Sequence, residues 1–422
     1  MVEQIKKILV DVGSSTIKIY KLYESGSVEL TITRSIPFKQ GFDPEVGISE
    51  INKKEMFELL LEVKGKYPGL PIKLYATALY RKMSPKTQRQ FIDEVFEKTG
   101  LYFNIVTQDL ESFYLQVALT GRYQNSSKPV LLINIGGGST ELVVMFGKEA
   151  VETRNVDLGV GTILTQFPNI NDPYSAVSLK EVVAFVDSKL PSLDNRVATA
   201  FYSGGELRYM QLAEYNLKKN DLFEDVDHPS YIVTDNFSKR NQEIFADVEL
   251  KDLESLMQDN PTWMHGARPC SAIAEAICRK YGVEVIIPSN SNLIDGVVRQ
   301  EFKNVTISGS FRKHLEYILR VRKHLVGRGV LVLSPRFTEP KNPGEEFVVF
   351  SGEEDMSPLK LERHHLNSID NSDALIVCDP EGYVGASAMI EIGYAQKIGK
   401  RIIFMEKPEE FMLQTLPAEV SL

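Results

Sequence analysis

Residues 9–20 read LVDVGSSTIKIY, and residues 132–144 read LINIGGGSTELVV. The second stretch can be laid on the first with one glycine inserted, and in each a glycine turn separates two apolar, β-branched segments that are typical of strands. Two matching segments so far apart in the chain indicate a duplicated domain and argue against a solenoid of short repeats. The open alternative is a chance similarity, because strand, glycine-rich turn and strand is a common local pattern.

The segments around the first turn predict the elements of one half of this duplication. Ser84 and Pro85 indicate a helix start, because serine caps a helix N-terminus and proline fits its first turn. After residue 129 the pattern of strand and turn begins again. Besides the two quoted stretches, we expect strands over 28–34, 72–77, 102–107 and 198–206, and helices over 55–67, from Pro85, from about Asp109 and over 178–190.

Near residue 303 the organisation changes. Strand and helix patterns alternate from there to the end of the printed sequence, which predicts a small parallel sheet covered by helices on both faces. A polar loop over 336–346 interrupts the alternation. The expected strands are 305–309, 329–335, 347–350, 373–379 and 401–406, and the expected helices are 311–325, 359–369 and 389–399.

Length and composition bound the class of protein. A chain of 422 residues suits two or three domains, and its three scattered cysteines, which we expect to be buried, favour a reducing cytosol. The formal net charge of −9 argues against a broad nucleic-acid surface, although a nest of backbone amides can hold phosphate in an acidic protein. Without an apolar signal segment or membrane-spanning run, a cytoplasmic protein is expected.

Both glycine turns carry groups that bind phosphate. Glycine lets the backbone approach an anion, and successive N–H groups and hydroxyls can surround its oxygens. Asp11 and its counterpart Asn134 end the first strand of each turn, where an oxygen ligand would hold Mg²⁺ (or Mn²⁺) or orient water. The candidate phosphate-binding residues are Gly13, Ser14, Ser15 and Thr16 in the first turn and Gly136, Gly137, Gly138, Ser139 and Thr140 in the second.

An ordered set of segments resembles the exopolyphosphatase and guanosine pentaphosphate phosphohydrolase family, within the actin, sugar-kinase and chaperone ATPase superfamily. DVGSSTIK (11–18) resembles the family's D-x-G-S-N-S-x-R/K, ATALYR (76–81) its A-T-S-A-x-R and QDLESFYL (108–115) its G-x-E-E-A-x-L. INIGGGSTELVV (133–144) resembles D-I-G-G-G-S-T-E, and 283–298 the closing strand and helix. The resemblance covers about residues 1–303. It implies a metal-dependent hydrolase of polyphosphate or guanosine penta- or tetraphosphate, and a homodimer.

The resemblance also implies roles for single residues. Glu111 matches the carboxylate that activates the attacking water, Arg81 the arginine near the transferred phosphate, and Glu141, with Asp11, the acidic positions around metal and water. Asn134 stands where the family has aspartate, and an amide cannot act as a base. A slow or inactive site is therefore one alternative. The others are that Arg81 is a surface cation, that Glu111 is a solvated helix residue and that Asp11 only forms the turn.

Two more segments carry weaker resemblances. Ser203–Glu206 resembles the third glycine turn of the superfamily, with a plain helix start as the alternative. In the last region, 307–311 and 372–404 resemble the nucleoside 2-deoxyribosyltransferase family and its D-x-G-T-x-x-E-x-G-x-A pattern, with a longer spacing before the glutamate. This resemblance implies a bound nucleoside or nucleotide. It makes Glu391 the nucleophile at an anomeric carbon, with Asp373 and Asp379 near the sugar and Ser308 and Gly309 near phosphate or base.

For Glu391 the alternative is a residue that caps or solvates the last helix while the domain only binds nucleotides or mediates assembly. His364 and His365 lie in a polar helix without spaced partners for a metal, and we expect them to face solvent.

Together these features predict an α/β chain in three domains. Residues 1–125 and 126–303 form a duplicated ribonuclease H-like pair, as in actin, sugar kinases and chaperone ATPases, and residues 304–422 form a small doubly wound parallel-sheet domain. Two functions besides phosphoanhydride hydrolysis stay open. One is cleavage of an N-glycosidic bond in the C-terminal domain, regulated by an N-terminal sensor of phosphate ligands. The other is a non-catalytic sensor of polyphosphate or a guanosine alarmone.

Overall fold

Three sheets organise the computed structural model, which describes residues 3–420 apart from 122–127, 148, 173–176, 224, 226, 259 and 301–303. The described chain divides into two compact units. Unit 1 contains residues 1–114 and 297–422, and unit 2 contains residues 115–296. The predicted domain boundaries, after residues 125 and 303, lie outside the described residues, so the three-domain division stays a prediction.

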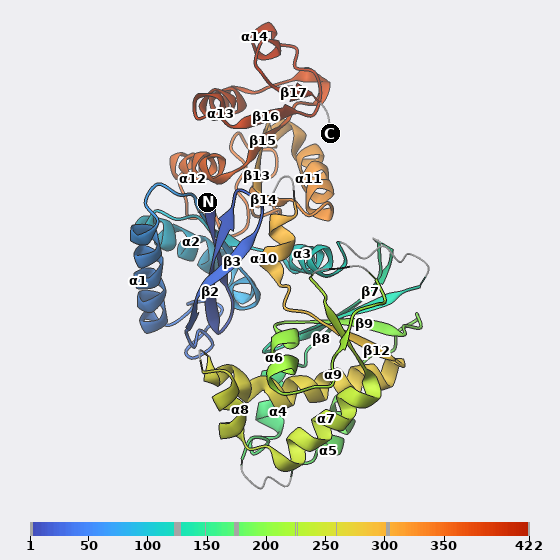
Figure 1. Cartoon of the computed structure of the whole chain (residues 1–422). Coiled ribbons are helices and arrows are strands. Elements are labelled where there is room, and N and C mark those ends of the chain that lie inside the picture. Colours follow the sequence, from blue (N-terminus) through green and yellow to red (C-terminus); the bar gives the residue numbers. More distant parts are fainter. Residues whose placement is uncertain are drawn as a thin grey trace. The chain divides into compact units, whose positions relative to one another are not determined.

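The first sheet has the strand order β3-β2-β1-β4-β5, and Figure 1 labels its strands β2 and β3. Strands β1, β2 and β3 form the expected antiparallel meander, whereas β4 and β5 run parallel to β1. Helix α2 begins as predicted, because the Ser84 hydroxyl accepts a hydrogen bond from the backbone N–H of Thr87 and Pro85 occupies the first turn. The elements are β1 Ile5–Val12, β2 Thr16–Tyr23, β3 Val28–Ser35, α1 Glu50–Lys66, β4 Ile72–Ala76, η1 Ala78–Lys82, α2 Pro85–Thr99, β5 Phe103–Ile105 and α3 Gln108–Thr120.

The second sheet repeats this plan. Its order is β10-β11-β12-β9-β6-β7-β8, in which β6, β7 and β8 form an antiparallel meander and β9 and β12 run parallel to β6. The series β8-β7-β6-β9-β12 therefore matches β3-β2-β1-β4-β5 strand for strand, which confirms the duplication. The strands are β6 Val130–Ile135, β7 Thr140–Phe146, β8 Glu149–Val156, β9 Thr199–Ser203, β10 Lys218–Lys219, β11 Ser230–Val233 and β12 Val285–Pro288.

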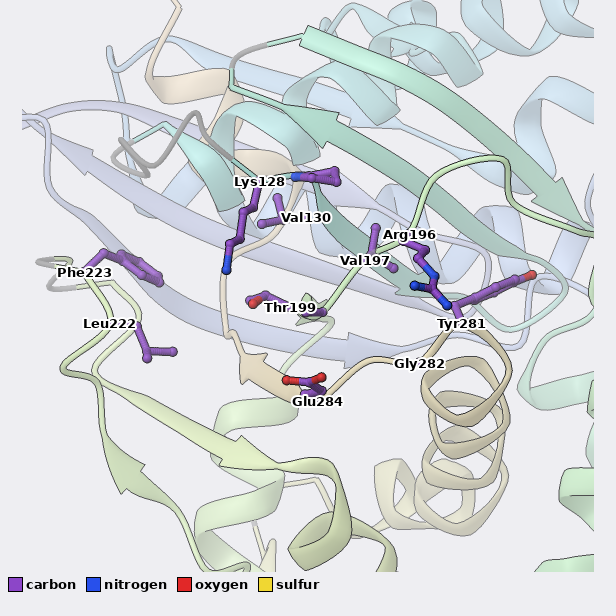
Figure 2. Close-up of a pocket in the computed structure, with 12 residues that line it drawn as sticks. Lys128, Val130, Arg196, Val197, Thr199, Leu222, Phe223, Tyr281, Gly282 and Glu284 are labelled. Atoms are coloured by element: carbon purple, nitrogen blue, oxygen red, sulfur yellow. The ribbon is translucent and has the colours of Figure 1, made fainter.

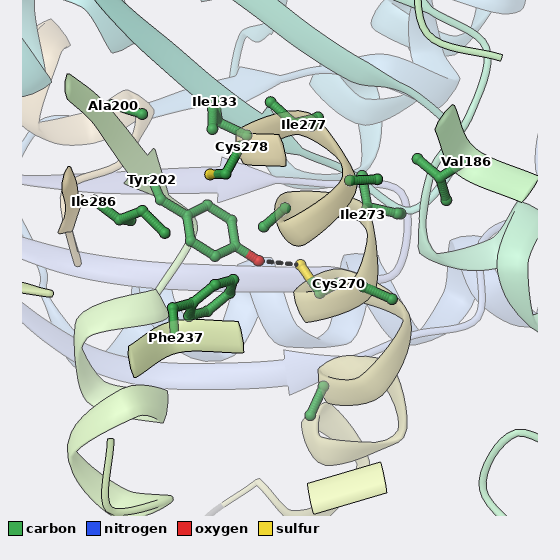
Figure 3. Packing of buried hydrophobic residues seen from close by; sticks show 14 of the residues in the cluster. Ile133, Val186, Ala200, Tyr202, Phe237, Cys270, Ile273, Ile277, Cys278 and Ile286 are labelled. Carbon is green, nitrogen blue, oxygen red and sulfur yellow. Dashed lines mark hydrogen bonds between the residues drawn. The ribbon is translucent and has the colours of Figure 1, made fainter. Parts of the chain in front are cut away.

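Helix α9 (Ala267–Tyr281) lies in the core of unit 2. It is rich in alanine and isoleucine and is buried on nearly all sides, against α5, α7 and β6. Figure 3 shows the Tyr202 hydroxyl directed at the Cys270 sulfur, 3.0 Å away, among these side chains. Cys270, Cys278 and Cys378 are all buried, as expected. The other helices are α4 Val160–Gln166, α5 Leu179–Asp187, α6 Glu206–Leu212, α7 Thr234–Asp247, α8 Leu250–Leu256, η2 Pro261–Gly266 and α10 Leu293–Val298.

The third sheet is parallel throughout, in the order β14-β13-β15-β16-β17. Ile318 of α11 packs on one face of the sheet, and Ile369 of α12 and Ile392 of α13 pack on the other, which confirms the predicted two-sided cover. The elements are β13 Asn304–Gly309, α11 Phe311–Gly327, β14 Leu331–Ser334, α12 Pro358–Asn371, β15 Ala374–Cys378, η3 Pro380–Gly382, α13 Ala386–Lys397, β16 Arg401–Phe404, α14 Phe411–Gln414 and β17 Glu419–Val420.

The predicted strand over 347–350 is wrong. Phe350 makes only an isolated bridge with Pro340, because the segment belongs to the long polar loop. There the Asn342 side chain accepts from the Val349 N–H at 2.6 Å and donates to the Phe347 carbonyl at 2.9 Å. Side-chain hydrogen bonds of this kind replace the pairing that a sheet would supply.

Within unit 1 the third sheet and its helices pack against the first sheet and its helices. Asp93 of α2 pairs with His364 at 3.0 Å and with Lys360 at 3.3 Å, both on α12. The Tyr102 and Ser368 hydroxyls lie 3.1 Å apart. In the part of the chain that the structure describes, no helix combines the length and apolar character needed to cross a membrane.

Candidate functional site

The first glycine turn closes the hairpin of β1 and β2. The Gly13 N–H donates to the Thr16 carbonyl at 2.9 Å, and Ser15 is exposed at the tip. Asp11 stands opposite Lys18 in the strand register. Burial raises the pKa of the Asp11 carboxyl, and the positive charge of Lys18 offsets part of that rise.

Arg81 and Glu111 form an ion pair near this turn. The Thr77 N–H donates to the Val12 carbonyl, so the chain leading to Arg81 follows directly beside β1. A terminal nitrogen of Arg81 lies 2.5 Å from a Glu111 carboxylate oxygen and also donates to the Val106 carbonyl at 3.1 Å. Burial raises the pKa of Glu111, which Arg81 lowers in part and the charge of Asp11 raises further. Asp11 and Glu111 are therefore close enough to interact electrostatically.

The exposure of this pair decides between two interpretations. The side chains of Arg81 and Glu111 are 20% and 21% exposed. A surface cation and a solvated helix carboxylate would both be largely exposed, so those alternatives are wrong. A partly buried arginine and carboxylate in contact attract each other more strongly than an exposed pair, because less water screens their charges.

The second glycine turn joins β6 and β7. The Gly136 N–H donates to the Ser139 carbonyl at 2.8 Å, and Asn134 stands opposite Glu141 in the register. Asn134 also lies beside Ser203 of the parallel strand β9. Glu141 is only 6% exposed. The hairpin of the second turn therefore keeps one carboxylate, which is on its second strand and not on its first.

A glycine segment braces the second turn. The N–H groups of Val160 and Gly161 donate to the carbonyls of Gly136 and Gly137 at 3.0 and 2.8 Å. A Cβ atom at Gly159 would lie 2.4 Å from the Gly136 oxygen, and one at Gly161 would lie 2.7 Å from the Gly137 oxygen. Only glycine fits at either position. Neither glycine is among the residues that the motifs predict, although the sequence DLGVGT directly after a strand is a signal of such a turn.

The third glycine turn begins helix α6. Gly204 and Gly205 have φ angles of +120° and +100°, which favour glycine. The Glu206 carboxyl is 2% exposed, lies 3.5 Å from the Cys270 sulfur, and has a pKa that burial raises to about 7. The carboxyl of Glu206 thus faces the core, and Glu206 is the first residue of α6.

Hard oxygen donors suited to Mg²⁺ are present in each unit. Unit 1 offers Asp11 and Glu111, and unit 2 offers Glu141 and the Asn134 amide oxygen. Among the described residues, no three or more His, Cys, Asp or Glu side chains gather in a way that could hold an ion by themselves. Mg²⁺ is commonly held by one or two carboxylates together with substrate phosphates, so such a group is not required. Burial raises the Asp11 pKa, and a divalent cation would offset this cost.

A cavity of about 590 Å³ lies in unit 2, and Figure 2 shows residues that line it. Its lining includes Val130, Thr199 and Glu284, which lie at or next to the amino ends of the parallel strands β6, β9 and β12. Asn134 lies near the opposite, carboxyl end of β6, and the second turn follows that end. This cavity is therefore separate from the phosphate-turn candidates.

A second cavity, of about 370 Å³, lies in unit 1 and contains Glu391. Glu391 is 4% exposed on α13, and the Ser308 hydroxyl donates to its carboxylate. Gly309 has a φ of +156°, and a Cβ there would meet the Cys378 carbonyl at 2.9 Å. The structure thus brings Ser308, Gly309 and Glu391 together, and Glu391 is not a solvated helix residue.

Asp373 and Asp379 do not join this group. Asp373 precedes β15, at the amino ends of the strands, and accepts a hydrogen bond from the Asn304 N–H at 3.0 Å. Asp379 follows the carboxyl end of β15 but accepts from the Glu406 N–H at 2.9 Å, and burial raises its pKa to about 6. Neither belongs to the described lining of the cavity.

The expectation that both histidines face solvent is wrong. His365 is only 9% exposed, because Leu361, Ser368 and Ile369 form the buried face of α12 with it. Its Nδ1 lies 2.7 Å from the Ser334 hydroxyl, and its Nε2 lies 3.2 Å from a Glu391 oxygen. Although burial opposes a charged imidazole, the neighbouring Glu391 raises the pKa of His365 overall. A helical spacing of apolar residues around His365 is the sequence signal for this burial.

Comparison with known proteins bears on unit 2 and on part of unit 1. The model of the Ppx/GppA phosphatase family matches residues 35–302. Among solved structures, a Ppx/GppA enzyme of Aquifex aeolicus is 19% identical with a TM-score of 0.53, and it covers 69% of this chain and 98% of its own. An exopolyphosphatase from Cytophaga hutchinsonii is 13% identical with a TM-score of 0.55, and the match covers 69% of this chain and 96% of the exopolyphosphatase. No curated protein sequence matches the chain.

These likenesses establish the fold of an actin-like ATPase tandem, with an additional parallel-sheet region. The family match ends at residue 302, so the third sheet lies outside it, and it begins at residue 35, after the first glycine turn.

Proposed function

Because this chain belongs to the Ppx/GppA phosphatase family, we propose that it hydrolyses the terminal phosphoanhydride bond of polyphosphate or of guanosine penta- or tetraphosphate. The observation that carries the proposal is the partly buried contact of 2.5 Å between Arg81 and Glu111 beside the first glycine turn. Mg²⁺ or Mn²⁺, when bound, would neutralise negative charge on the phosphate oxygens.

The residues of unit 1 suggest how water attacks the phosphate. A phosphate group that enters would compete with Glu111 for the guanidinium of Arg81, because both are anions. Arg81 would then stabilise charge on the transferred phosphoryl group, and the freed Glu111 carboxylate would orient a water and accept its proton. The raised pKa of Glu111 makes it a stronger base than an ordinary glutamate.

Release of orthophosphate tests this proposal. The full chain is incubated with polyphosphate, or with guanosine pentaphosphate, in the presence of Mg²⁺ or Mn²⁺. We expect release that falls about 100-fold or more in Glu111→Gln, because the base is lost while the side chain keeps its size. Glu97→Gln, an exposed glutamate on α2, is the control and should stay active. Absence of release from the wild type with either metal would contradict the proposal.

We also propose a second activity, cleavage of an N-glycosidic bond of a nucleoside, nucleotide or NAD in the cavity of unit 1. The observation that favours it is Glu391, buried at the cavity with the Ser308 hydroxyl and His365. A carboxylate oxygen of Glu391 would bond to the anomeric carbon as the carbon–nitrogen bond breaks, and the base would leave with the electron pair and take a proton from water. Water then hydrolyses the ester and restores the carboxylate.

Chromatographic detection of free base tests this second activity. We expect base release by the wild type and none by Glu391→Gln. Glu410→Gln, at an exposed position in the C-terminal region, is the control and should release base as the wild type does. Binding of nucleotides or polyphosphate without turnover in either assay would instead favour a non-catalytic sensor.

A further inference from the structure

The cavity that contains Glu391 has walls from two distant parts of the sequence. Arg89 of α2 and Tyr102, next to β5, line it together with residues of the third sheet and its helices. Arg89 pairs with Glu353, and the Tyr102 hydroxyl donates to the Leu333 carbonyl at 3.4 Å. The phosphatase-related part of unit 1 is therefore a structural component of this cavity.

The cavity offers groups that suit an anion. Helix α13 starts in its wall, and Gly385 gives that start no side-chain cap within the described residues. The first amides of a helix lack partners in the helix and, with the helix dipole, favour a negative group. A second, independent feature is Arg89, which is 6% exposed and whose Nε has no hydrogen-bond partner among the described residues.

The rest of the lining suits a sugar and a planar ring. Glu362 and Glu391 are acceptors for hydroxyl groups, and Phe311, Phe347 and Tyr383 present aromatic rings to the cavity. A volume of about 370 Å³ is within the range of small-molecule sites. An anion, a polyol and a flat ring together describe a nucleoside monophosphate.

Two hydrogen-bonded segments, joined by the backbone from Ser334 to Arg336, connect this cavity to Arg81. Ser334, which contacts His365 in the cavity wall, lies two residues before Arg336. Arg336 donates to the side-chain oxygen of Gln88 at 3.0 Å. The amide nitrogen of Gln88 donates in turn to the carbonyls of Arg81 at 3.3 Å and Met83 at 3.0 Å.

The environment of Arg336 makes this link sensitive to the position of its partners. Burial and the like charges of Arg89 and Arg322 lower the pKa of Arg336 to about 10. Tyr102 opposes part of this shift by raising the pKa of Arg336. A guanidinium held in such surroundings depends on its acceptors, because an unpaired buried donor is costly. A ligand that moves Ser334 or the Arg89 side chain would thus change the hold of Arg336 on Gln88.

We propose that a nucleoside monophosphate bound in this cavity changes the position of the Arg81–Glu111 ion pair through Arg336 and Gln88. The inference rests on the nucleotide cavity of the second proposed activity, but it requires no cleavage of a glycosidic bond. It makes the third-sheet region a regulatory module for the phosphatase-related site.

Hydrogen exchange tests the link without any catalytic readout. Exchange of the backbone amides over residues 78–88 is measured in the full chain, with and without each of the four common ribonucleoside 5′-monophosphates, and calorimetry shows which of them binds. We expect a bound nucleotide to change exchange over 78–88 in the wild type. Gln88→Met keeps the length of the side chain but removes its three hydrogen bonds, so it should bind the nucleotide and lose the change. Gln90→Met, an exposed neighbour on α2, should behave as the wild type.

A second measurement uses reciprocity. In the hydrolysis-impaired Glu111→Gln variant, the nucleotide and polyphosphate should change each other's affinity by one common factor, about 5-fold or more. If Gln88→Met does not fold, Arg336→Met breaks the same link from the other side. The proposal is overturned if no nucleotide binds, if a bound nucleotide leaves 78–88 unchanged, or if the change persists in folded Gln88→Met or Arg336→Met. None of these results depends on phosphate release, so failure of the phosphatase proposal is seen separately.

Discussion

The two glycine turns share a backbone design but carry their charges differently. In the first, Asp11 ends the incoming strand and faces Lys18. In the second, Asn134 ends the incoming strand and faces Glu141. The first hairpin thus carries its carboxylate on the incoming strand and the second on the outgoing strand. Asp11 is paired in the register with a lysine, whereas Glu141 is paired with an asparagine. Backbone amides that could bind phosphate are set by backbone geometry, which tolerates such exchanges, whereas metal binding and proton transfer would depend on the side chains.

The turns also differ in their support. The Ser15 carbonyl of the first turn accepts from the Ile36 N–H at 3.0 Å. The second turn is held at two carbonyls by the segment of Gly159 and Gly161, which leaves no space for a side chain. The second turn is thus more tightly constrained by its neighbours.

Asp11→Asn would make the first turn chemically like the second and should have the largest effect. The substitution keeps one side-chain oxygen but removes the negative charge that would attract a metal ion and that acts on Glu111. We expect phosphate release to fall about 10²–10⁴-fold. Phosphate release in the presence of Mg²⁺ measures it, with Glu97→Gln as a control for loss of a carboxylate. A variant that retained most of its activity would show that the two turns are interchangeable.

The third turn sharpens the comparison through stability, because its glutamate lies in the core. The folded pKa of Glu206, about 7, exceeds the usual 4.5, so the native state binds more protons between these values. Its contribution is complete below the unfolded pKa and is lost as pH rises through about 7. We expect the free energy of unfolding to drop by about 3 kcal/mol from this group between pH 5 and 8.

Denaturant unfolding of the wild type and of Glu206→Gln at several pH values measures this contribution. The free energy of unfolding of the wild type should fall relative to that of Glu206→Gln as the pH rises from 5 to 8, because the neutral amide does not titrate. A wild-type curve parallel to that of Glu206→Gln would refute the assignment.

Gly159→Ala should disturb the second turn alone. Its Cβ would lie 2.4 Å from the Gly136 oxygen and 2.7 Å from the Ser139 nitrogen. We expect a destabilisation of about 1–3 kcal/mol and a loss of phosphate release at temperatures where the variant stays folded. Gly138→Ala is the matched control for stability in the same turn, because apart from its chain neighbours none of the described atoms lies within 4 Å of its Cβ. Equal behaviour of the two variants would exclude the brace.

Asn134→Asp should have the smallest effect and the opposite sign. It gives the second turn a carboxylate in the place where the resemblance expects one. We expect phosphate release to rise about 10-fold at low metal concentration, because an added charge strengthens metal binding. Asn169→Asp, an exposed site in unit 2, adds the same charge elsewhere and should leave activity unchanged. A decrease in Asn134→Asp would indicate that Glu141 already fills this role.

Prediction from sequence succeeded where a structure is set by neighbours in the chain. The meander around Gly13, the helix start at Ser84 and the alternation after residue 303 all follow from local patterns. It failed over 347–350, because side-chain hydrogen bonds from Asn342 replaced strand pairing. It also failed at His365, whose burial depends on the sheet beneath α12.

The candidate site shows the same division. Motifs identified Arg81 and Glu111 separately, and only the packing of η1 beside α3 set them 2.5 Å apart. The support that the segment of Gly159 and Gly161 gives to the second turn was not predicted, because it depends on carbonyls some twenty residues away in sequence.

The sequence by itself determined the two glycine turns, their hydroxyl and amide groups, and the exchange of aspartate for asparagine at position 134, because these are properties of short segments. Only the tertiary structure decided that Glu391 shares a cavity with His365, that Arg89 and Tyr102 help to line it, and that the Gln88 side chain bonds to the Arg81 carbonyl. Those contacts join segments that are distant in the chain, and such segments meet only when the sheets and helices pack to bury their apolar faces.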